Sequence, residues 1–303
     1  MLQLVELNRR ARAALSHESF GYQSMDELDA LADAAIRRLR EQRARLASSS
    51  IERALSRLER RIDTTTLEYL DRPEHPATSK LRQVRWLHAQ NVLLGSYRRY
   101  LRLLGPSIAM AIEARAGAPA RLLELACGSG ELTSALARLA RDQEIAVEIT
   151  GSDIVEAYVH DASVRARRAN VPARFRRLNA FELSRELGPG EIDVAFMVQS
   201  LHHFTPGQLA RMIAQVGAAG ARRFVGMDGR RSLFMLGALP TLCALSLDPY
   251  FTHDAWISMR RLHAEAELAL IAAIAAPHAR VTVRSESGVL SILEVDYART
   301  EVA

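Results

Sequence analysis

The chain has 303 residues, of which 49% are hydrophobic, and a formal net charge of only +5. A chain of this length and composition buries a substantial core without disulfides or structural metals. Its two cysteines, Cys127 and Cys243, form no Cys-x-x-Cys pair, which argues against a disulfide framework and is typical of a reducing, cytoplasmic compartment. The longest apolar run, 233–247, contains a glycine and a proline and is shorter than the ~20 residues of a membrane span, so we expect no integral membrane contact.

Residues 1–118 are predicted to form an N-terminal helical cap that closes a site from above. Two runs of apolar residues recur at helical spacing, and Ser49 with Glu52 forms a capping box between them. The runs are Leu28, Leu31, Ala35, Leu39 and Ile51, Leu55, Leu58, Ile62. The arginine cluster at 37–45 has glutamates nearby and indicates a solvated helix face rather than a nucleic-acid site. A homodimer through these helices is left open.

The most informative stretch is 121–130, where an apolar strand ends at Glu124 and a glycine-rich turn leads into a helix at 132–140. Gly128 and Gly130 allow positive φ and let backbone N–H groups approach a ligand. A dinucleotide turn is disfavoured because Thr133 stands where its third glycine belongs. The only lysine, Lys80, lies in no Walker loop, and no Gly-x-Ser-x-Gly elbow is present.

The pattern Glu124-x-Ala126-x-Gly128-x-Gly130 resembles motif I of the class I S-adenosylmethionine-dependent methyltransferases, with Ala126 at the first glycine. A second strand, 145–153, ends in Asp153, which is similar to the family's ribose-binding acid. A third, 174–181, ends in Asn179-Ala180-Phe181, where the family contacts adenine. The alternative for these residues is an asparagine turn and a core phenylalanine. The resemblance implies S-adenosylmethionine as cofactor, held by Glu124, Ala126, Cys127, Gly128, Gly130, Asp153, Ile154, Asn179, Ala180, Phe181 and Gln199.

The fourth strand is predicted at 193–204, and its end, Ser200-Leu-His-His-Phe204, resembles motif IV of small-molecule methyltransferases. It is unlike the Asn/Asp-Pro-Pro-Tyr motif of enzymes that methylate bases or protein amides, so nucleic acid is not expected as a partner. Histidine titrates near neutral pH and suits proton removal from a hydroxyl. The catalytic candidates are therefore His203, then His202, with His253 beside Asp254 as a rival. Neither His202 with His203 nor His253 with Asp254 has the sequence spacing of metal ligands, so no metal is expected.

The remaining elements predict the rest of the sheet. A helix at 206–216 and a fifth strand at 223–228 precede a final hairpin of strands at 280–284 and 288–297. The resemblance thus implies a doubly wound, seven-stranded, mostly parallel sheet within a methyltransferase domain at 119–303. A helical insertion at 230–279 follows the fifth strand.

A narrower resemblance indicates the acceptor. The segments 68–76, 81–91 and 95–102 are similar to the helical lead-in of bacterial methyltransferases often encoded with polyketide synthases. The turn Asp228-Gly-Arg-Arg-Ser232 and the later His253-Asp254, Ser258 and Arg260 or Arg261 match the same group. This implies O- or C-methylation of a lipophilic, phenolic or polyketide-like small molecule in secondary metabolism, with 233–247, Tyr250, Phe251 and Trp256 lining its pocket. Two alternatives are a cyclase or decarboxylase that binds the same cofactor, and a non-catalytic adaptor.

Overall fold

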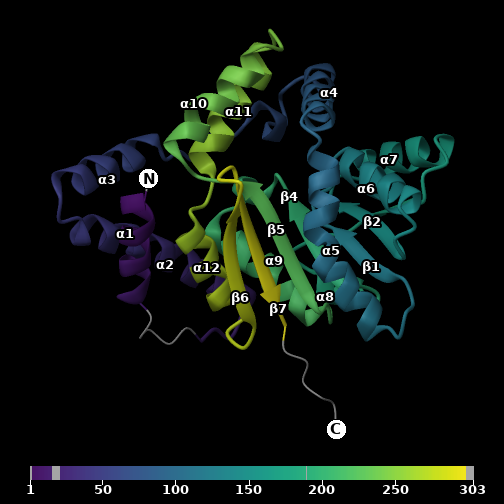
Figure 1. Ribbon diagram of the computed structural model, residues 1–303, viewed down its shortest axis with the longest axis horizontal. Coiled ribbons are helices and arrows are strands. Elements are labelled where there is room, and N and C mark those ends of the chain that lie inside the picture. The colour runs from purple at the N-terminus through teal and green to yellow at the C-terminus, as the bar shows by residue number, and fades with distance from the viewer. Residues whose placement is uncertain (1, 16–20, 189, 298–303) are drawn as a thin grey trace.

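The computed structural model describes residues 2–15, 21–188 and 190–297, which form an α/β fold around a seven-stranded sheet (Figure 1). The strand order is β3-β2-β1-β4-β5-β7-β6. Strand β7 is antiparallel to both of its neighbours, whereas the other adjacent pairs are parallel. The strands are β1 (Ala120–Glu124), β2 (Val147–Asp153), β3 (Ala173–Arg177), β4 (Val194–Val198), β5 (Arg223–Gly229), β6 (Arg280–Glu286) and β7 (Leu290–Asp296). The predicted fold class is confirmed.

The register brings the carboxyl ends of three central strands to one edge of the sheet. Glu124, the last residue of β1, lies opposite Gly151 of β2 and Phe196 of β4. Strands β2 and β4 continue two residues further, to Asp153 and Val198. The strand order reverses between β1 and β4, which is where open α/β sheets bind ligands.

Helices cover both faces of the sheet and build two apolar cores. Helices α5, α6 and α7 pack on one face around Leu104, Leu136 and Phe196, whereas α9 and α12 pack on the other around Ile213 and Ile271. The helices are α1 (Leu2–Ala13), α2 (Met25–Leu46), α3 (Ser50–Ile62), α4 (Ala77–Leu93), α5 (Ser96–Ala114), α6 (Glu131–Asp142), α7 (Glu156–Arg168), α8 (Leu183–Glu186), α9 (Pro206–Ala218), α10 (Leu233–Ala244), α11 (Pro249–Arg261) and α12 (Glu265–Ala275). Two 3₁₀ turns, η1 (Tyr69–Asp71) and η2 (Leu201–His203), complete the set.

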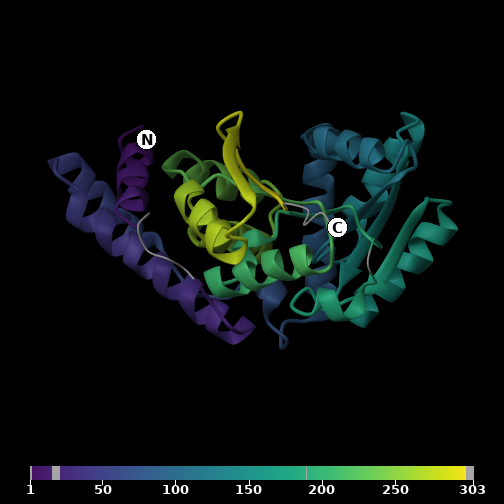
Figure 2. The same ribbon diagram turned by 90° about the horizontal axis from the view of Figure 1, so that it is seen from below.

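The N-terminal helices occupy two different places. Helix α2 runs along the outside of α9 and α12 (Figure 2). The approach is close, because a Cβ on Gly207 of α9 would lie 2.4 Å from the carbonyl oxygen of Asp29. The segment from η1 to α5 lies instead beside the strand ends. This second part is placed to cover a ligand there.

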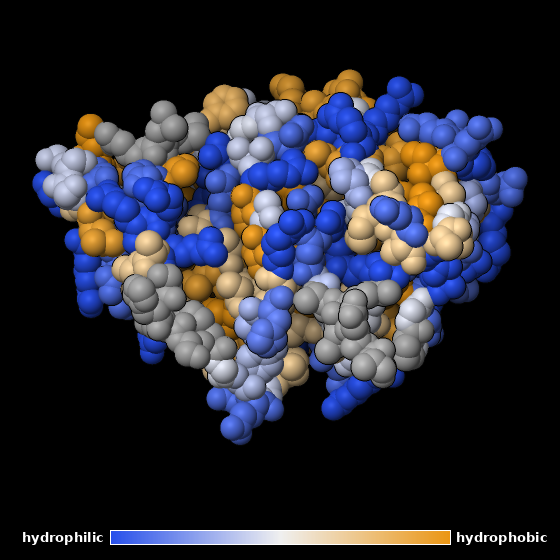
Figure 3. All heavy atoms as spheres, turned by 60° about the horizontal axis from the view of Figure 1, so that its bottom comes forward, coloured by the Kyte–Doolittle hydropathy of each residue, from blue (hydrophilic) through white to orange (hydrophobic). Residues whose placement is uncertain are grey.

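The capping box is confirmed. Ser49 Oγ accepts the Glu52 N–H at 3.1 Å, and the Glu52 carboxylate accepts the Ser49 N–H at 3.1 Å. The predicted solvated face of α2 is wrong for two of its arginines. Arg40 binds Glu267 of α12 at 2.7 Å, and Arg43 is 5% exposed and binds Glu59 of α3. These guanidinium groups hold helices together. Hydrophilic and hydrophobic side chains are intermixed over the lower face of the molecule (Figure 3).

The third and fourth strands are shorter at their carboxyl ends than the sequence predicted. Strand β3 ends at Arg177 because Asn179 begins a turn, in which its Oδ1 accepts the Phe181 N–H at 3.0 Å. Strand β4 ends at Val198 because Gln199 adopts the left-handed conformation, with φ 55°, and η2 follows. The histidines therefore lie on a turn beyond the sheet.

Helices α10 and α11 form a hairpin that stands beyond the ligand edge, next to α4 (Figure 1). The apolar run 233–247 is mostly exposed there, with Leu245 at 77% and Leu247 at 89%. Among the residues that the structure describes, no helix combines the length and apolar character needed to cross a membrane.

Candidate active site

The turn after β1 is shaped by positive φ angles and tied to β2. Ala126, Gly128 and Gly130 have φ of 52°, 53° and 74°, so Ala126 takes the conformation that the expected glycine would favour. The Asp153 carboxylate accepts the N–H of Gly128 and, through its second oxygen, the N–H of Val155, each at 2.9 Å. Asp153 therefore fixes the turn and keeps lone pairs on both oxygens for a ligand.

The two glycines serve different purposes. A Cβ on Gly130 would lie 2.4 Å from Phe175 Cε1 and 2.8 Å from Ala162 Cβ, so its hydrogen is required by packing of the protein itself. A Cβ on Gly128 would meet no protein atom within 4 Å. Gly128 thus faces open space at the end of β1, which suits close approach of a bound molecule to the backbone.

Glu124 is buried below this turn, with 3% of its surface exposed. The Thr133 hydroxyl of α6 donates to its carboxylate. Burial raises the pKa of Glu124 to about 8, and the hydrogen bond from Thr133 only partly offsets this. Close to neutral pH the group therefore carries a proton for much of the time, and a cationic ligand group nearby would favour its ionised form.

The predicted adenine-side residues follow the carboxyl end of β3. Besides its turn, Asn179 donates its side-chain amide to Glu182 at 3.3 Å. Phe181 packs edge-on against Phe204, with ring centroids 6.0 Å apart, and Ala180 packs beside it on the core. The asparagine turn at Asn179 and the core packing of Phe181, which were the alternatives to adenine contacts, are both present. Ile154 follows Asp153 and is 53% exposed, whereas Cys127 is buried.

Three residues that the sequence did not indicate lie over the ends of β1 and β4. Asn91 of α4 donates to the Gln199 side chain at 3.0 Å. His88 Nδ1 lies 2.8 Å from the Tyr97 hydroxyl and 3.8 Å from Glu131. Burial raises the pKa of Tyr97 above its usual range, so its hydroxyl stays protonated. These contacts place α4 and α5 directly over the edge where Glu124 and Gln199 lie.

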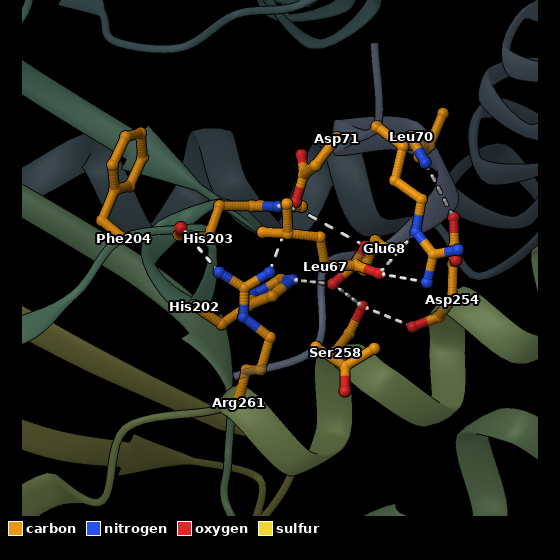
Figure 4. A network of polar contacts seen from close by, with 12 residues as sticks. Leu67, Glu68, Leu70, Asp71, His202, His203, Phe204, Asp254, Ser258 and Arg261 are labelled. Atoms are coloured by element: carbon orange, nitrogen blue, oxygen red, sulfur yellow. Dashed lines mark hydrogen bonds and ion pairs between the residues drawn. The ribbon is translucent and has the colours of Figure 1, made fainter. Parts of the chain in front are cut away.

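The two histidines of η2 belong to a cluster of carboxylates (Figure 4). His202 is 7% exposed; its Nδ1 lies 2.8 Å from Asp228 Oδ2 and its Nε2 lies 3.3 Å from Glu68 Oε1. His203 is 23% exposed; its Nδ1 lies 2.8 Å from Asp71 Oδ2 and its Nε2 lies 4.0 Å from Glu68 Oε2. Glu68 and Asp71 come from the segment around η1, more than a hundred residues before the histidines.

Helix α11 holds the η1 segment in place (Figure 4). Asp254 accepts the N–H groups of Tyr69 and Leu70 at 2.8 and 3.1 Å. Ser258 donates to Glu68 at 2.7 Å, and Arg261 donates to the His203 carbonyl at 2.8 Å. Four residues of the narrower sequence resemblance thus meet in one network, namely Asp228, which supports His202 from β5, and Asp254, Ser258 and Arg261 of α11.

Charge in the cluster is balanced mainly between imidazoles and carboxylates. Burial lowers the pKa of His202, but Asp228 and Glu68 outweigh it and raise that pKa to about 10. Burial raises the pKa of Asp71 and of Asp228, but His203 and His202 respectively outweigh it and hold both below the usual range. His202 is therefore an imidazolium at neutral pH, which suits charge stabilisation rather than proton acceptance.

His253 lies outside this cluster. Its ring packs against Tyr69 at an interplanar angle of 57°, with centroids 4.7 Å apart, and its Nδ1 lies 3.2 Å from Asp254 Oδ1. Since Asp254 is already bonded to the η1 backbone, the neighbouring pair mainly supports that turn.

Residues 122–220 match a family model described as a methyltransferase domain. The chain contains a methyltransferase domain. The match runs from β1 to the end of α9 and includes the glycine-rich turn and both cluster histidines. The match indicates methyltransferase activity, and the seven-stranded sheet agrees with a methyltransferase fold.

Solved structures share the fold at low sequence identity. The plantazolicin methyltransferase BamL, in complex with a triazolic desmethylPZN analog and SAH, is 12% identical, with a TM-score of 0.54, over 76% of this chain and 93% of that one. The plantazolicin methyltransferase BpumL, in complex with SAH, is 10% identical, with a TM-score of 0.53, over 82% and 100%. Magnesium protoporphyrin IX methyltransferase from Synechocystis PCC 6803, with bound SAH, is 19% identical, with a TM-score of 0.43, over 66% and 84%. Comparison with curated proteins finds no significant match.

Proposed function

We propose that this methyltransferase acts on the oxygen or carbon of a lipophilic small molecule of phenolic or polyketide-like character. The observation that carries the proposal is the exposed apolar surface beside the ligand edge. Helix α4 ends at Leu93, which is 83% exposed, and α10 begins shortly after the end of β5 with Phe234 63% exposed. Apolar surface of this kind next to a binding edge favours a hydrophobic acceptor.

The cofactor would be held at the carboxyl ends of β1 to β4. The open space at Gly128 and the free lone pairs of Asp153 support binding of a nucleoside there, with Asp153 on the ribose hydroxyls. Glu124, Ala126, Cys127 and Gly130 would shape the turn, Ile154, Asn179, Ala180 and Phe181 would flank the adenine, and Gln199 would face the methyl donor. When bound, S-adenosylmethionine supplies a methyl group that is already activated on a sulfonium.

The protein's own contribution is alignment and proton removal. Alignment of a nucleophile with the methyl group, with water excluded, contributes a large effective concentration. For a hydroxyl acceptor, His203 is the proposed base, because Asp71 fixes its Nδ1 and the residue is the more exposed of the pair. His202 would stabilise negative charge, and His253 is the alternative base.

The domain division at residue 118 and the homodimer are proposals as well. Strand β1 begins two residues after the division, and helices α10 to α12 fall within 230–279. The outer limits, Met1 and 298–303, lie outside the described residues. Support for a dimer comes from α3, where Ile51 and Leu58 of the predicted apolar face are 58% and 41% exposed.

The acceptor is tested with a panel of lipophilic phenols and hydrophilic amines, with methyl transfer from labelled S-adenosylmethionine as the readout. We expect transfer to the phenols, and a several-fold higher KM for the acceptor in Leu93→Ser. Ile51→Ser, which changes an exposed apolar residue of α3, is the control and should leave KM unchanged. Preference for amines, or equal KM values in both variants, would contradict a lipophilic acceptor.

A further inference from the structure

The side chains of Glu68, His202 and His203 converge on one point. One ligand atom from each residue lies within 4.8 Å of the other two. Glu68 oxygens lie 3.3 Å from His202 Nε2 and 4.0 Å from His203 Nε2. Ligands bound at about 2.0–2.2 Å from one ion are separated by roughly 3–4 Å, so the observed spacings match a shared ion. We propose that these three residues bind a divalent transition-metal ion.

The second nitrogen of each ring supports this assignment. His202 Nδ1 is 2.8 Å from Asp228, and His203 Nδ1 is 2.8 Å from Asp71. A carboxylate at Nδ1 directs the Nε2 lone pair outward and makes it more basic, which is the usual outer arrangement around metal-binding histidines. Both Nε2 atoms are thereby directed to the side where Glu68 lies.

The excess of carboxylates in the cluster also suits a bound cation. Glu68, Asp71 and Asp228 are carboxylates in direct contact with the two rings, and Arg261 lies 3.3 Å from Asp71. With neutral imidazoles, two negative charges remain, and the buried Glu68 oxygen would face a nitrogen lone pair. One divalent ion neutralises both charges.

The ligand set selects the kind of ion. Two imidazoles and one carboxylate suit Zn²⁺, Mn²⁺, Co²⁺ or Fe²⁺, whereas Mg²⁺ prefers oxygen ligands throughout. Three protein ligands leave positions for an exchangeable molecule, and the partly exposed His203 provides access. With the ion bound, His203 is a ligand, and the ion itself would lower the pKa of an acceptor hydroxyl. Only this last consequence rests on the proposed function. The inference differs from the sequence-based expectation of no metal.

The test is calorimetric titration of the chelator-treated full chain with ZnCl₂, MnCl₂ and MgCl₂, without cofactor or acceptor. We expect one ion bound per chain for Zn²⁺ or Mn²⁺ and none for Mg²⁺, together with a rise in the unfolding temperature on metal addition. Glu68→Gln keeps the shape of the side chain and should abolish binding. Asp71→Asn, at the partly exposed edge, should weaken it about 10–100-fold. His160→Gln, an exposed histidine of α7 outside the cluster, should bind as the wild type does.

Absence of Zn²⁺ and Mn²⁺ binding by the wild type would overturn the proposal. So would unchanged affinity in Asp71→Asn, a variant that remains informative if Glu68→Gln does not fold. Because the titration contains neither cofactor nor acceptor, a negative result leaves the methyl-transfer proposal standing. Methyl transfer that fails in the presence of a bound ion would count against that proposal alone.

Discussion

Replacement of Asp153 by alanine should weaken binding of S-adenosylhomocysteine without unfolding the protein. The carboxylate accepts two backbone N–H groups, from Gly128 and Val155 at 2.9 Å, and each oxygen retains a lone pair for a ribose hydroxyl. Loss of a hydrogen bond to a charged group costs about 1.5–3 kcal/mol. The dissociation constant should therefore rise by roughly 10- to 150-fold.

Isothermal titration calorimetry measures this change, and thermal unfolding reports whether the turn survives. Asp153→Asn retains an oxygen for the Gly128 N–H but loses the charge, so we expect an intermediate affinity. Glu156→Gln, an exposed carboxylate three residues further along, is the matched control and should bind normally. A folded Asp153→Ala variant with wild-type affinity would refute the assignment of Asp153 to the ribose.

Three further outcomes follow from the contacts. Gly130→Ala should destabilise the protein more than Gly128→Ala, because only the former clashes with Phe175. Gly128→Ala should fold but lose cofactor affinity. Chemical denaturation measures the stability and calorimetry the affinity, and the reverse order of stability would contradict this reasoning. Arg40→Ala leaves Glu267 buried without its main partner and should cost roughly 3 kcal/mol of unfolding free energy. Burial raises the pKa of Glu267, but Arg40 outweighs it and holds it at about 2, below its ordinary 4.5. The stabilisation is therefore full above pH 4.5 and is lost as pH falls toward 2, so the wild type and Arg40→Ala should converge in acid; a constant difference would disprove the linkage. His203→Ala should keep cofactor affinity and lower turnover on a hydroxyl acceptor by ~10²–10⁴-fold, and turnover within a few-fold of wild type would show that alignment alone drives the reaction.

The amino-acid sequence by itself determined the fold and the cofactor end of the site. These features depend on neighbours in the chain. A buried strand that ends in Glu124, followed by glycines at positive φ and a helix, forms one local unit, and Asp153 ends the next strand in the same way. Parallel strands bring such ends together, so periodicity and turn chemistry were sufficient to predict the sheet and the glycine turn after β1, whereas the cofactor roles of these residues came from the family resemblance.

Only the tertiary structure decided the histidine end of the site. Glu68 and Asp71 lie in a short turn with no local pattern. Glu68 nevertheless contacts His202, 134 residues later, and Asp71 contacts His203, 132 residues later. Asn91 reaches Gln199 across 108 residues in the same manner. Arg40 and Arg43 likewise bind carboxylates of other helices, which the sequence around them does not indicate. Burial makes each of these groups require a specific partner, and a linear pattern cannot indicate which distant residue supplies it.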